Sequence, residues 1–131
     1  MKQLLVILVI LVVIALYVVT GAESVSKAIE NYSDKNIKQA EQKEKILFFN
    51  ASYCSFVGKY KRSIELIDKF IDTYDESNML DGAYYLRAKT LDASLDITGA
   101  KAAYKDFLDK YPDSKYAENV KNRLNELKTF Y

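Results

Sequence analysis

Residues able to do chemistry are few and scattered in this chain. The sequence holds no His, one Cys and 18 Asp and Glu against 19 Lys and Arg. Catalytic and metal sites need imidazoles, thiols or carboxylates at fixed short spacings, and no Cys pair, carboxylate cluster or Gly-rich phosphate loop occurs. The regularly spaced acids are typical of solvated helix faces: Asp68, Asp72, Asp106 and Asp109. We therefore expect a protein that is not an enzyme and that has no cofactor, metal or small-molecule substrate.

A row of aromatic residues points to binding instead. In a predicted helix over residues 37–57, Phe49, Tyr53 and Phe56 stand at positions i, i+4 and i+7, which lie on one side of a helix. Two interpretations remain open. This aromatic stripe packs between neighbouring helices, or it forms a groove for a partner helix together with Tyr85 and Leu86. The same helix carries a second apolar stripe of Ile46, Leu47, Ala51 and Cys54.

The N-terminal apolar run decides where these side chains act. Residues 4–19 carry no charge, Gly or Pro, and with residues 20–22 they approach the ~20 residues that a helix needs to cross a membrane. We expect an uncleaved signal anchor over residues 1–22, which contacts the membrane through residues 4–20. Lys2 and the short tail favour a cytoplasmic N-terminus and an extracytoplasmic domain. The alternative is a signal peptide cleaved after Ala22, and without a Cys at its end the run is not a lipoprotein signal.

The rest of the chain is long enough for one small domain. From Glu23 onward it carries 18 basic and 18 acidic residues, so no basic excess favours nucleic acid as a partner. The single Cys54 cannot form a disulfide within the chain. Only one Pro and four Gly occur, which favours long helices.

The apolar periodicity predicts helices throughout and no strand. Residues 23–32 can continue the membrane helix, and the other helices are expected over 37–57, 60–74, 79–95, 100–111 and from Ser114 to the C-terminus. Asp34 or Asn36, Thr98 and Ser114 are predicted caps.

A 37-residue internal repeat organises these helices. The segment 60–77 falls on 97–114, with Ser63 on Ala100, Phe70 on Phe107 and other matches at Ile67/Tyr104 and Tyr74/Tyr111. Small residues at 63 and 100 would let the two helices of a repeat approach, and the large residues would fill the space between pairs. Cys54 falls on Leu91, which predicts a buried thiol rather than a reactive one.

On these residues the chain resembles tetratricopeptide repeats, in particular those of bacterial envelope proteins of the BamD and CpoB types. The second copy follows their pattern through Ala100, Tyr104, Phe107, Leu108, Tyr111, Pro112, Ser114, Tyr116 and Ala117. The first copy departs from it at Asp75, Met79 and Leu80. The resemblance implies stacked helical hairpins that contact other proteins.

We therefore expect an all-α chain with three parts: a transmembrane anchor (1–22), a juxtamembrane helix or linker (23–36) and a repeat domain of two repeats plus a capping helix (37–131). The domain would act as a membrane-anchored scaffold for protein partners in a bacterial envelope assembly, with the domain in the periplasm. Two repeats are fewer than a stable solenoid needs, so burial from residues 23–36, from the capping helix or from a partner is expected. The alternatives are a small subunit of a membrane complex, held mainly by its transmembrane helix, and a soluble periplasmic adaptor after cleavage.

Overall fold

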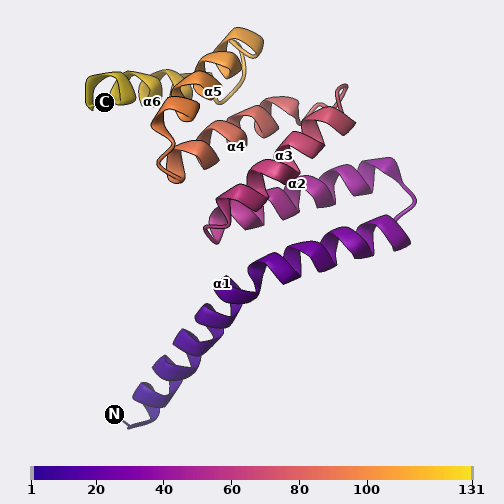
Figure 1. The fold of residues 1–131 in the computed structure, drawn as a ribbon, viewed down its shortest axis with the longest axis vertical. Coiled ribbons are helices and arrows are strands. Elements are labelled where there is room, and N and C mark those ends of the chain that lie inside the picture. Colours follow the sequence, from indigo (N-terminus) through magenta and orange to yellow (C-terminus); the bar gives the residue numbers. More distant parts are fainter. Residues whose placement is uncertain (1, 131) are drawn as a thin grey trace.

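The chain forms six α-helices, and no strand occurs in residues 2–130, which the computed structural model describes (Figure 1). Side chains are described for these residues except 2, 5, 17–19 and 130. The helices are α1 (Lys2–Asn36), α2 (Ala40–Phe56), α3 (Tyr60–Thr73), α4 (Leu80–Ala93), α5 (Ile97–Lys110) and α6 (Ala117–Phe130). The predicted all-α class is confirmed. Met1 of the expected anchor and Tyr131 of the expected repeat domain lie outside the described residues.

The 37-residue period is visible in the helix boundaries. α5 begins and ends 37 residues after α3, and α4 ends 37 residues after α2. The turns between the paired helices also correspond, because Gly58 (φ 79°) and Leu95 (φ 65°) both adopt the left-handed conformation. Each repeat is thus a hairpin, α2–α3 or α4–α5, closed by the same three-residue turn.

Contacts repeat with the same period. The Ser77 hydroxyl donates to the Glu44 carboxylate, and the Ser114 hydroxyl donates to Asp81 at 2.6 Å. Ring pairs repeat in the same way: Phe48–Phe70 at 5.7 Å and Tyr85–Phe107 at 6.1 Å. The sequence repeat therefore corresponds to two copies of one packing arrangement.

The core lies between the helices of each hairpin. Phe70 and Phe107 are fully buried, as predicted. Ser63 and Ala100 are also fully buried, and the Ser63 hydroxyl donates to the Ala51 carbonyl oxygen at 2.8 Å. The small side chains at these positions do bring the paired helices close together.

α1 is one helix whose two halves differ in role. Residues 6–16 and 20–36 are inclined by 53°, and the second half runs beside α2 while the first leads away from the domain (Figure 1). Ala22, Ser26 and Ser33 are buried, and the Asn50 side-chain amide donates to the Ser26 carbonyl oxygen at 2.9 Å. The expected supplement of burial from residues 23–36 is present.

An ion-pair cluster joins α1 to α3. Arg62 and Lys69 of α3 both pair with Glu30, with Lys69 at 2.5 Å. Burial by itself would raise the pKa of Glu30, but the hydrogen bonds of Lys69 and Arg62 lower it, so the carboxylate is charged at neutral pH.

Within the described residues, no single helix has both the length and the apolar composition to cross a membrane. Segments 6–16 and 20–36 of α1 meet this requirement only together, as a bent pair.

The predicted caps are only partly correct. α1 runs through Asp34 and ends at Asn36, and α2 begins after Gln39 without a side-chain cap. At α5 the cap is Asp96 rather than Thr98, because the Asp96 carboxylate accepts from the Gly99 N–H, three residues on, at 2.9 Å. Ser114 accepts from the Tyr116 N–H at 3.3 Å, just before α6 begins.

Candidate protein-interaction surface

The aromatic stripe of α2 is largely uncovered. Phe49 is 64% exposed and Phe56 is 91% exposed, whereas Tyr53 is half-buried against the core of the first repeat. Exposed phenylalanine rings seven residues apart lie two turns apart on one helix side. They form an apolar strip along α2 that this chain does not cover.

Tyr85 and Leu86 of α4, the other candidates, are half-buried. Tyr85 stacks on Tyr116 with ring centroids 4.4 Å apart, and Leu86 packs against the core of the first repeat. The structure therefore packs Tyr85 within the second repeat and Leu86 between the two repeats, and it leaves Phe49 and Phe56 as the exposed members of the candidate set.

The repeat explains why Phe49 is exposed and Tyr53 only half-buried. Their counterparts 37 residues on, Leu86 and Thr90, face the first repeat, and the Thr90 and Ser55 hydroxyls lie 2.9 Å apart. The corresponding face of α2 would receive the first helix of a preceding repeat. In the same register, that helix would be residues 3–19, the apolar run itself, which leads away from the domain in α1. The face is thus a repeat-stacking surface without its partner helix.

The opposite end of the stack has a different character. α6 buries Ala117, Val120, Leu124 and Leu127 on one side. α2 contacts its paired helix through Leu47, Ala51 and Cys54, and α4 does so through the corresponding residues Tyr84, Ala88 and Leu91. In α6 the corresponding residues are Lys121, Asn125 and Lys128, all exposed. α6 therefore presents a polar face at the positions where α2 and α4 contact their paired helices.

A cavity of about 200 Å³ lies where α1, α2 and α3 meet. Glu30 and Ser33 line it, and they occupy the places that Ile67 and Phe70 fill with large apolar side chains one repeat later. The cavity is smaller than the ~300–1,000 Å³ of typical small-molecule sites. It can admit one side chain or a few waters, so the exposed aromatic strip remains the larger candidate surface.

The described residues show no arrangement for catalysis. Within residues 2–130, no group of three His, Cys, Asp or Glu side chains is placed to hold a metal ion. Cys54 is fully buried, and burial raises the pKa of its thiol, which disfavours the reactive thiolate. The exposed aromatic strip on α2 is therefore the candidate site in this part of the chain.

Comparison with known proteins agrees with this picture. The protein family described as YfiO, outer membrane lipoprotein, matches residues 22–130. Relatives from Xylella fastidiosa strains 9a5c and Temecula1 are named outer membrane protein assembly factor BamD. Each is 33% identical over 92 residues, covering 56% of this chain and 32% or 31% of the relative. The chain thus spans about a third of the length of these relatives, and no solved structure matches it. The expected resemblance to BamD-type repeats is confirmed.

Proposed function

The chain belongs to the YfiO family of outer membrane lipoproteins, and on this premise we propose that it is a membrane-tethered scaffold for protein contacts in a bacterial cell-envelope assembly. The observation that carries the proposal is the difference between the two ends of the repeat stack. The α6 end is polar, whereas the α2 end exposes Phe49 on a face whose counterpart in α4 packs against another helix.

The partner that fits this face is an α-helix with a stripe of small and apolar residues. Such a helix would lie against Phe49 and Tyr53 as α2 lies against Leu86 and Thr90. Aromatic rings are frequent hot spots of protein interfaces, where truncation costs about 2 kcal/mol or more. Since the matched relatives are named as outer membrane protein assembly factors, we place the partner in the assembly of outer membrane proteins.

We further propose that residues 1–22 anchor the chain, with the domain in the periplasm. The segment 4–16 is uncharged and its described side chains are exposed, which suits lipid better than water. Residues 23–36 then join the anchor to the repeat domain (37–131) as a packed helix. Carbonate extraction should leave the chain in the membrane with its N-terminus intact, and a soluble chain beginning at Glu23 would contradict the anchor.

Site-specific photo-crosslinking in intact cells tests the partner face. A photoreactive residue at position 49 should form adducts with an envelope protein, whereas the same residue at position 121, on the polar end, should not. A matched pair of variants, Phe49→Glu and Lys121→Glu, then separates binding from folding. Both should melt within a few degrees of the unmodified protein, and only Phe49→Glu should lower the amount of assembled outer membrane proteins. Equal adducts at both positions, or no effect of Phe49→Glu, would contradict the proposal.

The second candidate is an accessory subunit bound mainly through its transmembrane helix, which the exposed apolar side chains of residues 6–16 favour. Replacing residues 4–19 by an unrelated apolar helix distinguishes the two functions. Crosslinks at position 49 should persist if the repeat domain is the scaffold, and they should disappear if the anchor itself recognises the partner.

A further inference from the structure

Two apolar side chains stand out of the domain at equivalent turns. Outside the N-terminal run, Phe56 (91%) and Leu95 (79%) are the most exposed large apolar residues that the structure describes. Phe56 ends α2 beside the α2–α3 turn, and Leu95 lies in the α4–α5 turn. Because the two turns are 37 residues apart, they lie on the same side of the repeat stack, which we term the turn edge (residues 56–60 and 94–96; Figure 1).

Leu95 is an unexpected residue for its conformation. Its φ of 65° lies in the left-handed region, where a side chain crowds the backbone and glycine is preferred. The first repeat has Gly58 at this position. A large apolar side chain that is both strained and uncovered contributes nothing to the folding of this chain. Backbone strain of this kind concentrates at functional positions, so a surface outside this chain that covers Leu95 and Phe56 together would account for both residues.

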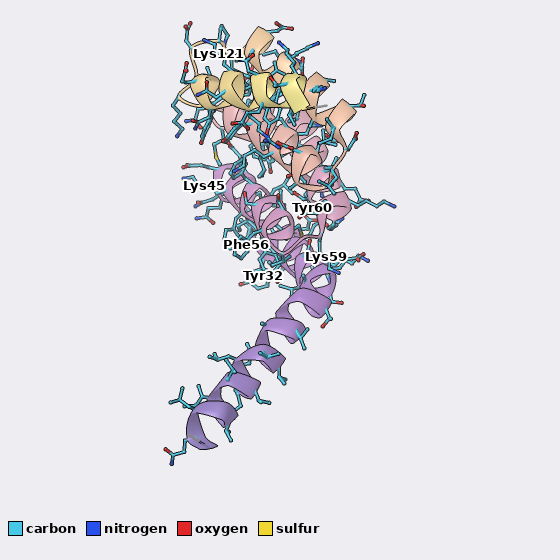
Figure 2. All side chains as sticks on the ribbon, turned by 90° about the vertical axis from the view of Figure 1, so that its left-hand side faces the viewer. Tyr32, Lys45, Phe56, Lys59, Tyr60 and Lys121 are labelled. Carbon is cyan, nitrogen blue, oxygen red and sulfur yellow. The ribbon has the colours of Figure 1, made fainter. Side chains whose placement is uncertain are left out.

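The turn edge lies where α1 leaves the domain. Glu23, the first charged residue after the apolar run, lines the same open surface hollow as Gly58, Lys59 and Tyr60. Figure 2 shows Phe56, Lys59 and Tyr60 at the end of the domain from which α1 extends. If the apolar run spans the bilayer, these residues are at the level of its surface.

The composition of the turn edge matches this location. Phe56, Tyr60 and Leu95 supply apolar and aromatic surface, and Lys59, with Lys61 next to the edge, supplies positive charge. The one acid of the edge is Asp96, whose carboxylate accepts a hydrogen bond from the Gly99 N–H. In the described part of the chain, neither Lys59 nor Lys61 forms an ion pair, while the neighbouring Arg62 pairs with Glu30 and Glu65. Aromatic rings and free lysines are typical of protein segments in the headgroup region of a bilayer with anionic lipids.

We propose that the turn edge rests on the surface of the bilayer that holds α1, with the Phe56 and Leu95 side chains among the lipid headgroups and Lys59 and Lys61 facing anionic lipid. This inference rests on the proposed membrane anchor. It gives the domain a fixed tilt relative to the membrane.

Tryptophan fluorescence can test the contact, because the sequence has no Trp. Single variants of the full chain are reconstituted in phosphatidylethanolamine–phosphatidylglycerol vesicles that contain brominated lipids, which quench Trp in contact with the bilayer. Phe56→Trp and Leu95→Trp probe the turn edge, and Val12→Trp probes the anchor. Asn78→Trp, at an exposed position in the α3–α4 turn on the other side of the stack, is the matched control.

Bromines near the headgroups should quench Phe56→Trp and Leu95→Trp, deep bromines should quench Val12→Trp most, and Asn78→Trp should keep its full emission. If Val12→Trp is quenched but both edge variants behave like Asn78→Trp, the turn-edge contact is wrong while the anchor stands. That result is also expected if a protein, absent from these vesicles, is the true occupant of the edge. If Val12→Trp is not quenched, the anchor fails and the inference fails with it.

Discussion

Replacing Phe107 by Ala should remove a large part of the stability of the repeat domain. Phe107 is fully buried, and its ring centroid lies 6.1 Å from Tyr85 and 5.8 Å from Tyr111. Losing roughly 100 Å² of buried ring surface at about 25 cal/mol per Å² costs about 2.5 kcal/mol. The two ring pairs add about 0.5–1 kcal/mol each. The total of about 3.5–4.5 kcal/mol falls within the usual cost of a buried Phe→Ala change, about 3–5 kcal/mol.

The tyrosine near-UV circular dichroism of the full chain in detergent micelles gives a suitable melting curve. Ten of the 11 Tyr residues follow residue 22, so the signal reports the domain and not the apolar helix. At about 4–8 °C per kcal/mol for a domain of this size, Phe107→Ala should melt at least about 12 °C lower than the unmodified protein. The matched control is Phe49→Ala, which removes a ring that is 64% exposed and should change the free energy of unfolding by about 0.5 kcal/mol or less.

A Phe107→Ala protein that melts with the unmodified chain would show that α4, α5 and α6 do not meet around this ring. A Phe49→Ala protein as unstable as Phe107→Ala would show instead that the strip on α2 is packed.

Two further predictions concern backbone strain and pH. Leu95→Gly should raise the free energy of unfolding by about 1 kcal/mol, because it relieves the left-handed backbone, and Gly58→Ala should lower it by a similar amount, as urea denaturation can measure. Burial, with the charge and hydrogen bond of Asp92, raises the pKa of Tyr104 above its ordinary value of 10.0. The neutral phenol is therefore favoured in the folded state, so its contribution is complete below about pH 10 and is lost as the pH rises further. Tyr104→Phe should be less stable at neutral pH but should lose less stability than the unmodified protein between about pH 10 and pH 12; parallel slopes in urea titrations would contradict this.

The 37-residue period of the sequence predicts the repeats well, because the residues that recur with this period are the ones that pack inside the hairpins. The large residues at 67, 70 and 74 recur 37 positions later, and both copies are held by the same ring contacts. The third, partial copy is harder to find. Residues 23–36 of α1 align with α3 at a shift of 37 residues, and Ser26 then corresponds to Ser63. At the positions of Ile67 and Phe70, however, α1 has Glu30 and Ser33. With these replacements the apolar periodicity disappears, and only the buried small residues and the ion pairs to Glu30 show that the segment belongs to the stack.

The exposure of the aromatic strip was only partly predictable. The surplus of aromatic residues on α2 suggests an open surface, yet the sequence cannot separate Phe49, which is exposed, from Tyr53, which is half-buried one turn away. Leu95 gives no signal at all. An apolar residue that follows a helical run is expected to continue it, and the prediction of a helix over 79–95 did so, whereas α4 ends at Ala93. Its exposure depends on a left-handed backbone that Leu rarely adopts.

α1 leads from the apolar run into the domain through a 53° bend, and this helical connection fixes the rotation of the domain relative to the apolar run. An α-helix turns about 100° and rises 1.5 Å per residue. Since Ser26 and Glu30 tie the second half of α1 to α2 and α3, one alanine inserted near Gly21 would rotate the domain by about 100° around the axis of that half. Seven inserted residues would nearly restore the original rotation of the domain while shifting it by about 10 Å along the same axis. The number of residues between the apolar run and Ser26 thus determines the rotation of the domain, and with it the side of the domain that meets a neighbour in the membrane plane.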